Sequence, residues 1–516
     1  MRYETALRAA LIVVLLQAFG CSQRQAIYLD VRRSRTRAYL AWTREKETGI
    51  NSGALLSGEL SLERAVLEAL AHSKVIREAV EERTRGRGRL WQGYSEALPK
   101  LSANASYYRL DEPTGGTIQA GDTTLSVGDE SSYSYGFILR QPLFRGGAIA
   151  AAMRAAEVFD LMADEQVRSS VEKVMHEVCA GYLEVLLAQR LHEVYREAQK
   201  SAEGHLDEVS KRRVAGLATE FEVLRAEVEA SNVQAEAVRQ DNKIKLAFAA
   251  LLNAMGASQR SDLALITPLQ YLKSETDFDT AVGIAYENRA DLGQAELEVR
   301  MQEQALRQAR AGLFPSLDAF VVNLWSKPDP HDSTKIAWGH RWYGGVALTW
   351  NVFDGLRREG QIVEQGAILR QRKVRLEAVE EQVLLELKQA LVSIQDAERL
   401  IDTQELNVEH AREGLELATK GYPEVATLVE VTDARAALVR AWGLYWQAVK
   451  DHCRARLDLQ KGMGLLAPMP GTEGLEPAVS PAANILPPVE QEPTPDAEEA
   501  SDGGQVRSLS AFKDEE

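Results

Sequence analysis

The sequence contains few cysteines and no long hydrophobic run. Its 516 residues include only Cys21, Cys179 and Cys453, too few for a disulfide framework. Cys179 and Cys453 fall inside helical patterns, where we expect small buried apolar residues. No stretch holds eighteen consecutive apolar residues, so hydropathy excludes a transmembrane helix. A chain of this kind could cross a membrane only as a closed barrel, because backbone groups in lipid need partners within the protein.

The sequence also lacks the common catalytic motifs and an excess of basic residues. The sequence has no Walker loop, HExxH, G-x-S-x-G or dinucleotide fingerprint, so we expect no enzymatic activity and no cofactor. His176 and Cys179 have helical spacing, but two ligands do not make a metal site, and we expect none. The net charge is −16, and beyond residue 464 eleven acids stand against two bases. This balance argues against a nucleic-acid partner.

The first twenty residues predict an export signal. The basic residues Arg2 and Arg8 precede an apolar core over residues 9–16, and this core is too short to span a bilayer. Residues 18–21, Ala-Phe-Gly-Cys, are similar to a bacterial lipobox, so we predict a signal peptide over 1–20 and lipidation of Cys21. The alternative is an ordinary signal peptide followed by an incidental cysteine. Residues 21–60 would then connect the anchor to the body of the protein.

Helical periodicity dominates the rest of the chain. Ser61 is a good N-cap for a first helix, which we expect to break near residues 85–89 and to end before Pro99. The later helices should be far longer than globular ones and should pair as antiparallel coiled coils about 75–100 Å long. The expected long helices occupy 148–254 with a break at 214–217, 277–313, 357–420 and 428–463.

Four short segments between these helices alternate in polarity and predict β-strands. The clearest is 342–351, in which Trp342, Val346 and Leu348 share one face while small or polar residues occupy the other. One apolar face with aromatic ends and one polar face are typical of a strand in a membrane barrel. The four predicted strands are 101–110, 133–141, 317–325 and 342–351, and the predicted membrane-interface aromatics are Tyr107, Tyr133, Trp342 and Trp350.

Four landmarks recur in the same order at spacings of about 208 residues, which indicates an internal repeat. They are Leu98-Pro99 and Phe314-Pro315, Phe144-Arg145-Gly146 and Phe353-Asp354-Gly355, Gly216 and Gly421, and residues 253–256 and 461–464. We therefore divide the chain into a first repeat over 61–256, a linker over 257–275 and a second repeat over 276–464. Residues 465–516 hold eight of the sixteen prolines and many acids, and we expect this tail to be disordered.

Each repeat would supply helix, strand, loop, strand and helical hairpin. Four strands per chain cannot close a barrel, and open strand edges cannot face lipid, so several copies should share one barrel. The fold class expected is mostly α with a small β part: long antiparallel coiled-coil helices plus four transmembrane strands per chain. The product would be a channel through the membrane that continues as a hollow helical bundle.

The ordered motifs resemble the outer membrane efflux protein family, the TolC family. The resemblance rests on residues 288–292 (NRADL), 311–317 (AGLFPSL), 348–355 (LTWNVFDG) and 214–224 (VAGLATEFEVL). It implies a homotrimer, a twelve-stranded barrel in the outer membrane and a periplasmic helical tunnel. It also implies two partners, a periplasmic adaptor protein and an inner-membrane pump, in drug or metal efflux or in type I secretion.

The resemblance further implies roles for the hairpin tips. Val214, Gly216, Leu217 and Gly421 would dock the adaptor at the far end of the tunnel. Glu430 and Asp433, three residues apart, match the paired acids of the family's tunnel constriction and would form a gate that favours cations. The alternative is that both acids simply stabilise the start of a helix. The second tip is expected to be about three residues longer than the first.

One different class of protein fits part of the pattern. An exported, lipid-anchored coiled coil without a pore could act as a structural tether. The two amphipathic strand pairs argue against it, because a tether needs no such strands. The substrate of a duct would not be visible in the sequence, since a conduit contacts its cargo only loosely.

Overall fold

The computed structural model describes residues 29–40, 43, 55–111, 117–120, 123–126, 129–273, 276–332, 335–422 and 424–466. The predicted signal peptide, Cys21 and all of the tail beyond Leu466 lie outside the described residues. Within the predicted connector, residues 29–40 are helical rather than a simple polar linker. None of the described helices has the length and apolar composition needed to cross a membrane.

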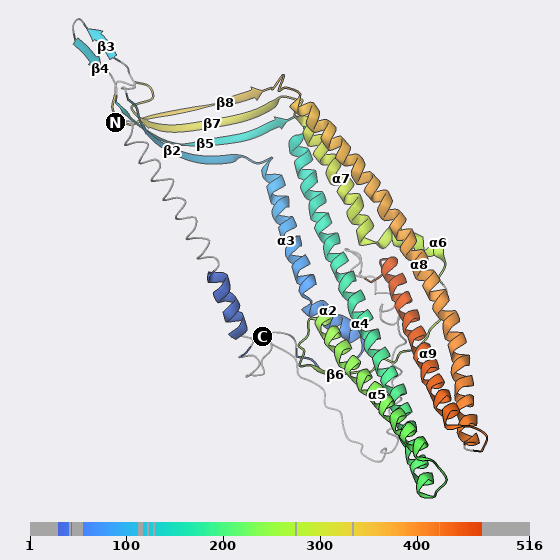
Figure 1. Cartoon of the computed structure of the whole chain (residues 1–516). Helices are drawn as coiled ribbons and strands as arrows, with labels where there is room; N and C mark the ends of the chain where they lie inside the picture. The colour runs from blue at the N-terminus through green and yellow to red at the C-terminus, as the bar shows by residue number, and fades with distance from the viewer. Residues whose placement is uncertain are drawn as a thin grey trace, which may run out of the picture.

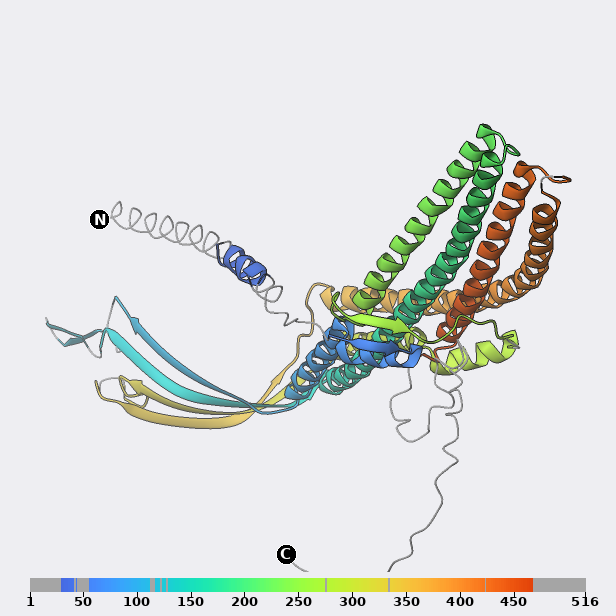
Figure 2. The same ribbon diagram turned by 90° about the horizontal axis from the view of Figure 1, so that it is seen from below.

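Two helical hairpins form most of the molecule. α4 (Ala148–Val214, 67 residues) and α8 (Arg357–Gly421, 65 residues) run from the strands to the far end, where α5 (Glu220–Met255) and α9 (Leu428–Gly462) fold back against them. Both turns lie at the same end of the molecule, away from the strands (Figures 1 and 2). Helices this long cannot bury a face within one globule, so each packs along its neighbour as the coiled-coil prediction requires.

Shorter helices precede each strand pair and are interrupted once. α2 (Leu62–His72) and α3 (Lys74–Ser95) break at Ser73, and α6 (Phe278–Asn288) and α7 (Ala290–Ala311) break at Arg289. Ser61 caps α2 as predicted, since its hydroxyl accepts the backbone N–H of Arg64 at 3.2 Å.

The predicted break at residues 85–89 is wrong, because α3 continues through them. Gly86 within these residues and Gly93 further along α3 serve helix packing, whereas Gly88 has open space around it. A β-carbon on Gly86 would lie 3.0 Å from the Ala163 β-carbon, and one on Gly93 would lie 2.4 Å from the Ala156 β-carbon. They let α3 approach α4 closely at a small cost in helix propensity.

Four strands form one antiparallel sheet in the order β2-β5-β7-β8. β2 (Lys100–Arg109) and β5 (Ser131–Arg145) come from the first repeat, and β7 (Ser316–Lys327) and β8 (Gly339–Thr349) come from the second. The central pair β5–β7 joins the repeats, with Tyr135 opposite Trp325. Among the described strands, β2 and β8 pair on one side only, so this sheet has two open edges.

Two smaller sheets were not predicted. β1 (Ser57–Leu60) pairs in parallel with β6 (Asp262–Leu265), tying the end of the connector to the linker between repeats. β3 (Thr117–Ala120) and β4 (Thr123–Ser126) pair within the loop that joins β2 to β5. Both pairs are four residues long, too short for periodicity to distinguish them from loops.

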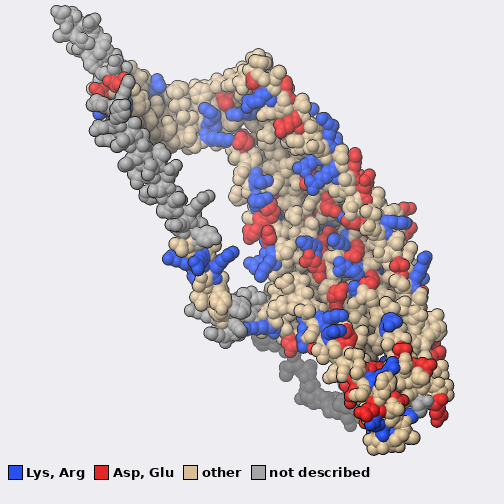
Figure 3. Space-filling model, in the orientation of Figure 1, with Lys and Arg blue, Asp and Glu red and all other residues tan. Residues whose placement is uncertain are grey.

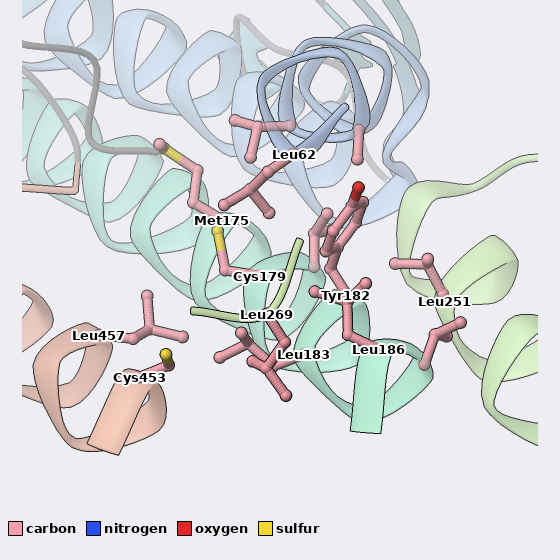
Figure 4. Packing of buried hydrophobic residues seen from close by; sticks show 14 of the residues in the cluster. Leu62, Met175, Cys179, Tyr182, Leu183, Leu186, Leu251, Leu269, Cys453 and Leu457 are labelled. Atoms are coloured by element: carbon pink, nitrogen blue, oxygen red, sulfur yellow. The ribbon is translucent and has the colours of Figure 1, made fainter. Parts of the chain in front are cut away.

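The main core lies where α2, α4, α5 and α9 meet (Figure 4). Tyr182 of α4 is fully buried, and its hydroxyl donates to the Leu60 carbonyl at 2.8 Å and accepts the Thr267 N–H at 3.3 Å. Cys179 and Cys453 belong to this core, as predicted, and burial raises the pKa of each thiol to about 12. Both therefore act as small apolar residues.

Each repeat ends with a glycine that docks on the helix break of the same repeat. Gly256 has φ 69°, and a β-carbon there would lie 2.7 Å from the His72 carbonyl oxygen. Gly464 has φ 72°, and a β-carbon there would lie 2.7 Å from the Asn288 carbonyl oxygen. Only glycine combines this left-handed backbone with such a close approach. The repeat detected in the sequence is thus also a repeat of packing.

Candidate functional site at the hairpin tips and the strand–helix junctions

The first hairpin tip, residues 215–219 between α4 and α5, exposes apolar side chains. Val214 is 91% exposed and Leu217 is 71% exposed. Gly216 turns the backbone with φ 77°, a conformation that would cost another residue about 1–2 kcal/mol. The last turn of α4 adds three basic residues. Apolar side chains rimmed by charge are typical of a surface that binds another protein.

The second tip, residues 422–427 between α8 and α9, has a different turn. It is one residue longer than the first tip, not three as predicted. Gly421 ends α8 without a positive φ, so it does not repeat the turn made by Gly216. Tyr422 instead leaves the helix in an extended conformation, as expected of a residue that precedes proline. Val425 is 89% exposed and gives this tip its own apolar surface.

Glu430 and Asp433, the predicted gate pair, lie in the first turns of α9. The Glu430 carboxylate accepts the backbone N–H of Thr427 at 2.6 Å and its hydroxyl at 3.0 Å, and the Thr427 hydroxyl oxygen accepts the Glu430 N–H at 3.3 Å. The backbone hydrogen bond is the main reason that the pKa of Glu430 is lowered. Thr219 and Glu222 form the same capping box in the first repeat. Glu430 therefore caps its helix, whereas Asp433 is exposed one turn later.

One buried ion pair joins the two hairpins near their tips. Arg435 of α9 is 5% exposed, and its guanidinium donates to Glu229 of α5 at 2.7 Å and to the Ser201 hydroxyl of α4 at 3.2 Å. Beside this pair, the rings of His205 (α4) and Tyr422 meet edge to face at 5.4 Å. Burial, and then the charge of Arg435, lower the pKa of His205.

Arg435 was not predicted from the sequence, because its partner lies 206 positions away. A signal was present, however. Leu428 and Val431 begin a buried stripe on α9, and Arg435 continues it one turn later. An arginine on an apolar stripe requires a buried acceptor, since an unpaired buried charge is strongly unfavourable.

The sheet exposes one apolar face, as the alternation in the sequence predicted. Along β5, Tyr133, Tyr135 and Phe137 are each more than a third exposed, while Ser132 and Gly136, which point to the other face, are buried. In β8, Trp342, Val346 and Leu348 are 62–69% exposed. Figure 3 shows the strands as a largely uncharged surface, with charged side chains becoming frequent where the helices begin.

Aromatic side chains gather at both ends of this sheet. At the end away from the helices, Tyr107 and Tyr133 are register partners with ring centroids 4.8 Å apart. At the helix end, Trp350 lies just after β8 and its indole N–H donates to the Leu313 carbonyl at 3.2 Å. Trp342 lies inside β8, opposite Asn323.

Three further aromatic residues, which the sequence analysis did not select, join the group at the far end. Tyr135 stacks on Trp325 at 5.4 Å and meets Trp338 at 5.3 Å. The sequence signal for Trp325 was its place at the end of a predicted strand.

The two strand–helix junctions carry opposite charges at corresponding positions. Before α4, Arg145 donates to the Asp318 carboxylate of β7 at 2.9 Å. Before α8, Asp354 takes the place of Arg145 and lies 3.0 Å from the Arg358 guanidinium. Arg358 is 8% exposed and also donates to the carbonyls of Gly312 at 3.0 Å and Val352 at 3.2 Å. It therefore fastens the start of α8 to the end of α7.

Comparison with known proteins decides the family. Residues 65–257 and 281–465 match the family described as "Outer membrane efflux protein". The chain belongs to this family. The two matched blocks correspond closely to the two repeats seen in the fold, and they include all the helices from α4 to α9 that build the hairpins.

Relatives within the outer membrane efflux protein family are distant. The chain is 25% identical over 307 residues to outer membrane protein OprJ of Pseudomonas aeruginosa, covering 59% of this chain and 63% of that protein. It is 27% identical over 168 residues to the outer membrane efflux protein BepC of Brucella suis, covering 33% and 35%. The matches thus span less than two thirds of each relative.

Solved structures of other proteins share the fold of this chain. A membrane protein from Pseudomonas aeruginosa aligns with a TM-score of 0.68 at 22% identity, covering 78% of this chain and 92% of that one. The outer membrane protein VceC of Vibrio cholerae aligns with a TM-score of 0.68 at 20% identity, covering 78% and 96%. The mostly helical fold with a small sheet, predicted from the sequence, is confirmed.

Proposed function

We propose that this chain is the outer-membrane exit duct of a tripartite efflux or type I secretion system. The observation that carries the proposal is the four-stranded sheet, which exposes an apolar face, keeps two open edges and leads into helices of 67 and 65 residues. An open apolar sheet is unstable in water and in lipid alike, whereas pairing of β2 with β8 of another copy would satisfy both edges. A shared barrel with long helices below it forms a tube.

The proposed assembly is a homotrimer. Three copies of the four-stranded sheet would give twelve strands. The aromatic groups around Tyr107 and Tyr133 at one end, and Trp350 at the other, would mark the two membrane interfaces. Trp342 would face lipid within β8. The helices would extend into the periplasm, and lipidation of Cys21 would add an anchor at the outer membrane.

The proposed partners bind at the hairpin tips, at the end of the molecule away from the strands. The exposed Val214, Leu217 and Val425 give each tip an apolar surface that a periplasmic adaptor could cover, and the adaptor would link the duct to an inner-membrane pump. Gly216 and Gly421 shape these tips. Glu430 and Asp433 remain the proposed gate, with Asp433 the stronger candidate because the Glu430 carboxylate is already engaged at its helix cap.

A test of the duct compares membrane behaviour with the tether alternative. The full chain should fractionate with the outer membrane, migrate as a trimer and open discrete conductance steps in planar bilayers. Replacing Asp433 with alanine should reduce cation preference more than replacing Glu430 does. A helical monomer that is held at membranes only by its lipid anchor and opens no conductance would support the lipid-anchored tether and exclude the duct.

A further inference from the structure

A basic pocket lies beside the first strand–helix junction. It has a volume of about 310 Å³ and is bounded by the start of α4 and the end of α7. Its lining includes Arg154, Arg307 and Arg310, with Gly147 and Phe314 at the side of the strands. Among the residues that the structure describes, those lining it include no Asp or Glu. Three guanidinium groups around one hollow favour an anion.

Two observations indicate that the pocket is built for a ligand. The three arginines are exposed, and none forms an ion pair with a carboxylate of the described chain. Gln304 also lines the pocket but is only 8% exposed, and its buried side-chain oxygen has no hydrogen-bond partner among the described residues. A buried amide oxygen without a partner is unfavourable, and a hydroxyl or ammonium donor in the pocket would satisfy it.

The start of α4 adds a third anion-attracting element. Neither α4 nor α8 has a side-chain cap at its N-terminus, but α4 also has no acidic residue in its first turn. The corresponding start of α8 has Glu359 in its first turn and Asp354 just before it. Since the N-terminus of a helix carries a partial positive charge, the second repeat places its own acids beside this terminus, whereas Asp318 at the first junction comes from β7 and is paired with Arg145.

We propose that this pocket binds the phosphate diester of a phospholipid headgroup in the periplasmic leaflet of the outer membrane. The arginines and the α4 N-terminus would hold the phosphate, and the Gln304 oxygen would accept a hydrogen bond from the headgroup alcohol or amine. Phe144 and Phe314, 47% and 57% exposed at the strand ends, would lie against the acyl chains. This inference rests on the proposed placement of the strands in the membrane.

The test measures lipid retention by the full-length, detergent-purified protein with native mass spectrometry. The probes are palmitoyl-oleoyl phosphatidylglycerol and, as the soluble headgroup, glycerophosphoglycerol. The pocket variant is Arg154→Gln/Arg307→Gln/Arg310→Gln. The control Arg370→Gln/Arg375→Gln/Arg399→Gln removes three exposed charges from α8, outside the pocket. Ala150→Trp fills the pocket while keeping every charge.

Phosphatidylglycerol should bind about tenfold more weakly to the pocket variant and to Ala150→Trp, and with unchanged affinity to the α8 control. Equal losses in the control and the pocket variant would mean general attraction to a basic surface and would overturn the proposal. Full displacement of the lipid by equimolar glycerophosphoglycerol would assign the pocket to a free phosphate ester, contrary to the proposal.

Planar-bilayer recordings of the same preparations separate this inference from the proposed function. A conducting protein whose Ala150→Trp variant retains phosphatidylglycerol normally would overturn the lipid site alone. Absence of conductance would overturn the duct, whatever the lipid measurements give.

Discussion

The two repeats share a backbone plan and differ in charge. Each has a broken helix, two strands, a hairpin with a capping box and a terminal glycine docked on the helix break. At the strand–helix junction, however, the first repeat has Arg145 and no acid in the first turn of α4, whereas the second has Asp354 and, in the first turn of α8, Glu359. The shared features are those that packing and backbone geometry require. The differing features are charged groups at the strand–helix junctions, where Arg145 contacts the second repeat and Asp354 contacts its own.

The largest predicted effect concerns the link between repeats. Arg435→Met should destabilise the protein by about 3 kcal/mol, because it leaves Glu229 partly buried without its partner. Arg213→Met, which removes an exposed pair with Glu220, should cost less than about 0.5 kcal/mol. Urea unfolding followed by circular dichroism compares the two. Equal costs would mean that the hairpins are not held together by this pair.

The terminal glycines test whether the repeats are equivalent in packing. Gly256→Ala and Gly464→Ala should each destabilise by about 2 kcal/mol or more, because both add a β-carbon in a left-handed conformation against backbone atoms. Gly360→Ala, inside α8 with open space around it, should be neutral or slightly stabilising. Thermal unfolding of the three variants is the measurement. A large effect at only one terminal glycine would mean that the two repeats are not equivalent in packing.

The two capping boxes should contribute less to stability than the terminal glycines do, and their contributions should be equal. Thr219→Ala and Thr427→Ala should each cost about 1 kcal/mol, with fraying confined to the start of α5 or α9. Hydrogen exchange of the first turns would detect this. A much larger effect of Thr427→Ala on ion selectivity than of Thr219→Ala would connect the second cap with the proposed gate through Glu430.

The smallest effect is a pH dependence that only the first repeat should show. Burial raises the pKa of Glu172 to about 7, although Arg168 and Arg289 oppose the shift. The folded state therefore holds this proton more tightly than the unfolded state, and its stability falls as pH rises from about 4.5 through 7.

Glu172→Gln should consequently raise the Tm by about 1–2 °C at pH 8 and leave it unchanged at pH 4. Glu381, at the corresponding position of α8, is exposed, so Glu381→Gln is the matched control and should have no such effect. A pH-independent gain in the Glu172 variant would mean that its carboxyl is not the titrating group.

Periodicity predicted the long elements well because long elements depend on repeated local patterns. The expected helices 357–420 and 428–463 agree with α8 and α9 to within one residue at each end. Gly86 was misread, since a glycine that permits close packing and a glycine that ends a helix look alike in sequence.

The Arg435–Glu229 pair and the pocket around Arg154 join residues that are far apart in the chain, and no local pattern can reveal them. What the sequence could indicate was an arginine on an apolar stripe, and that signal becomes informative only once the buried face is known.

In the proposed function, several copies of this chain close one barrel and conduct. The most direct test is single-channel recording of the purified full-length protein in planar bilayers, beside a variant with Val346→Pro in the edge strand β8, where proline weakens strand pairing. We expect discrete, uniform conductance steps for the wild-type protein and their loss in the variant. Membrane-inserted protein that gives no conductance, or a variant that conducts normally, would contradict it.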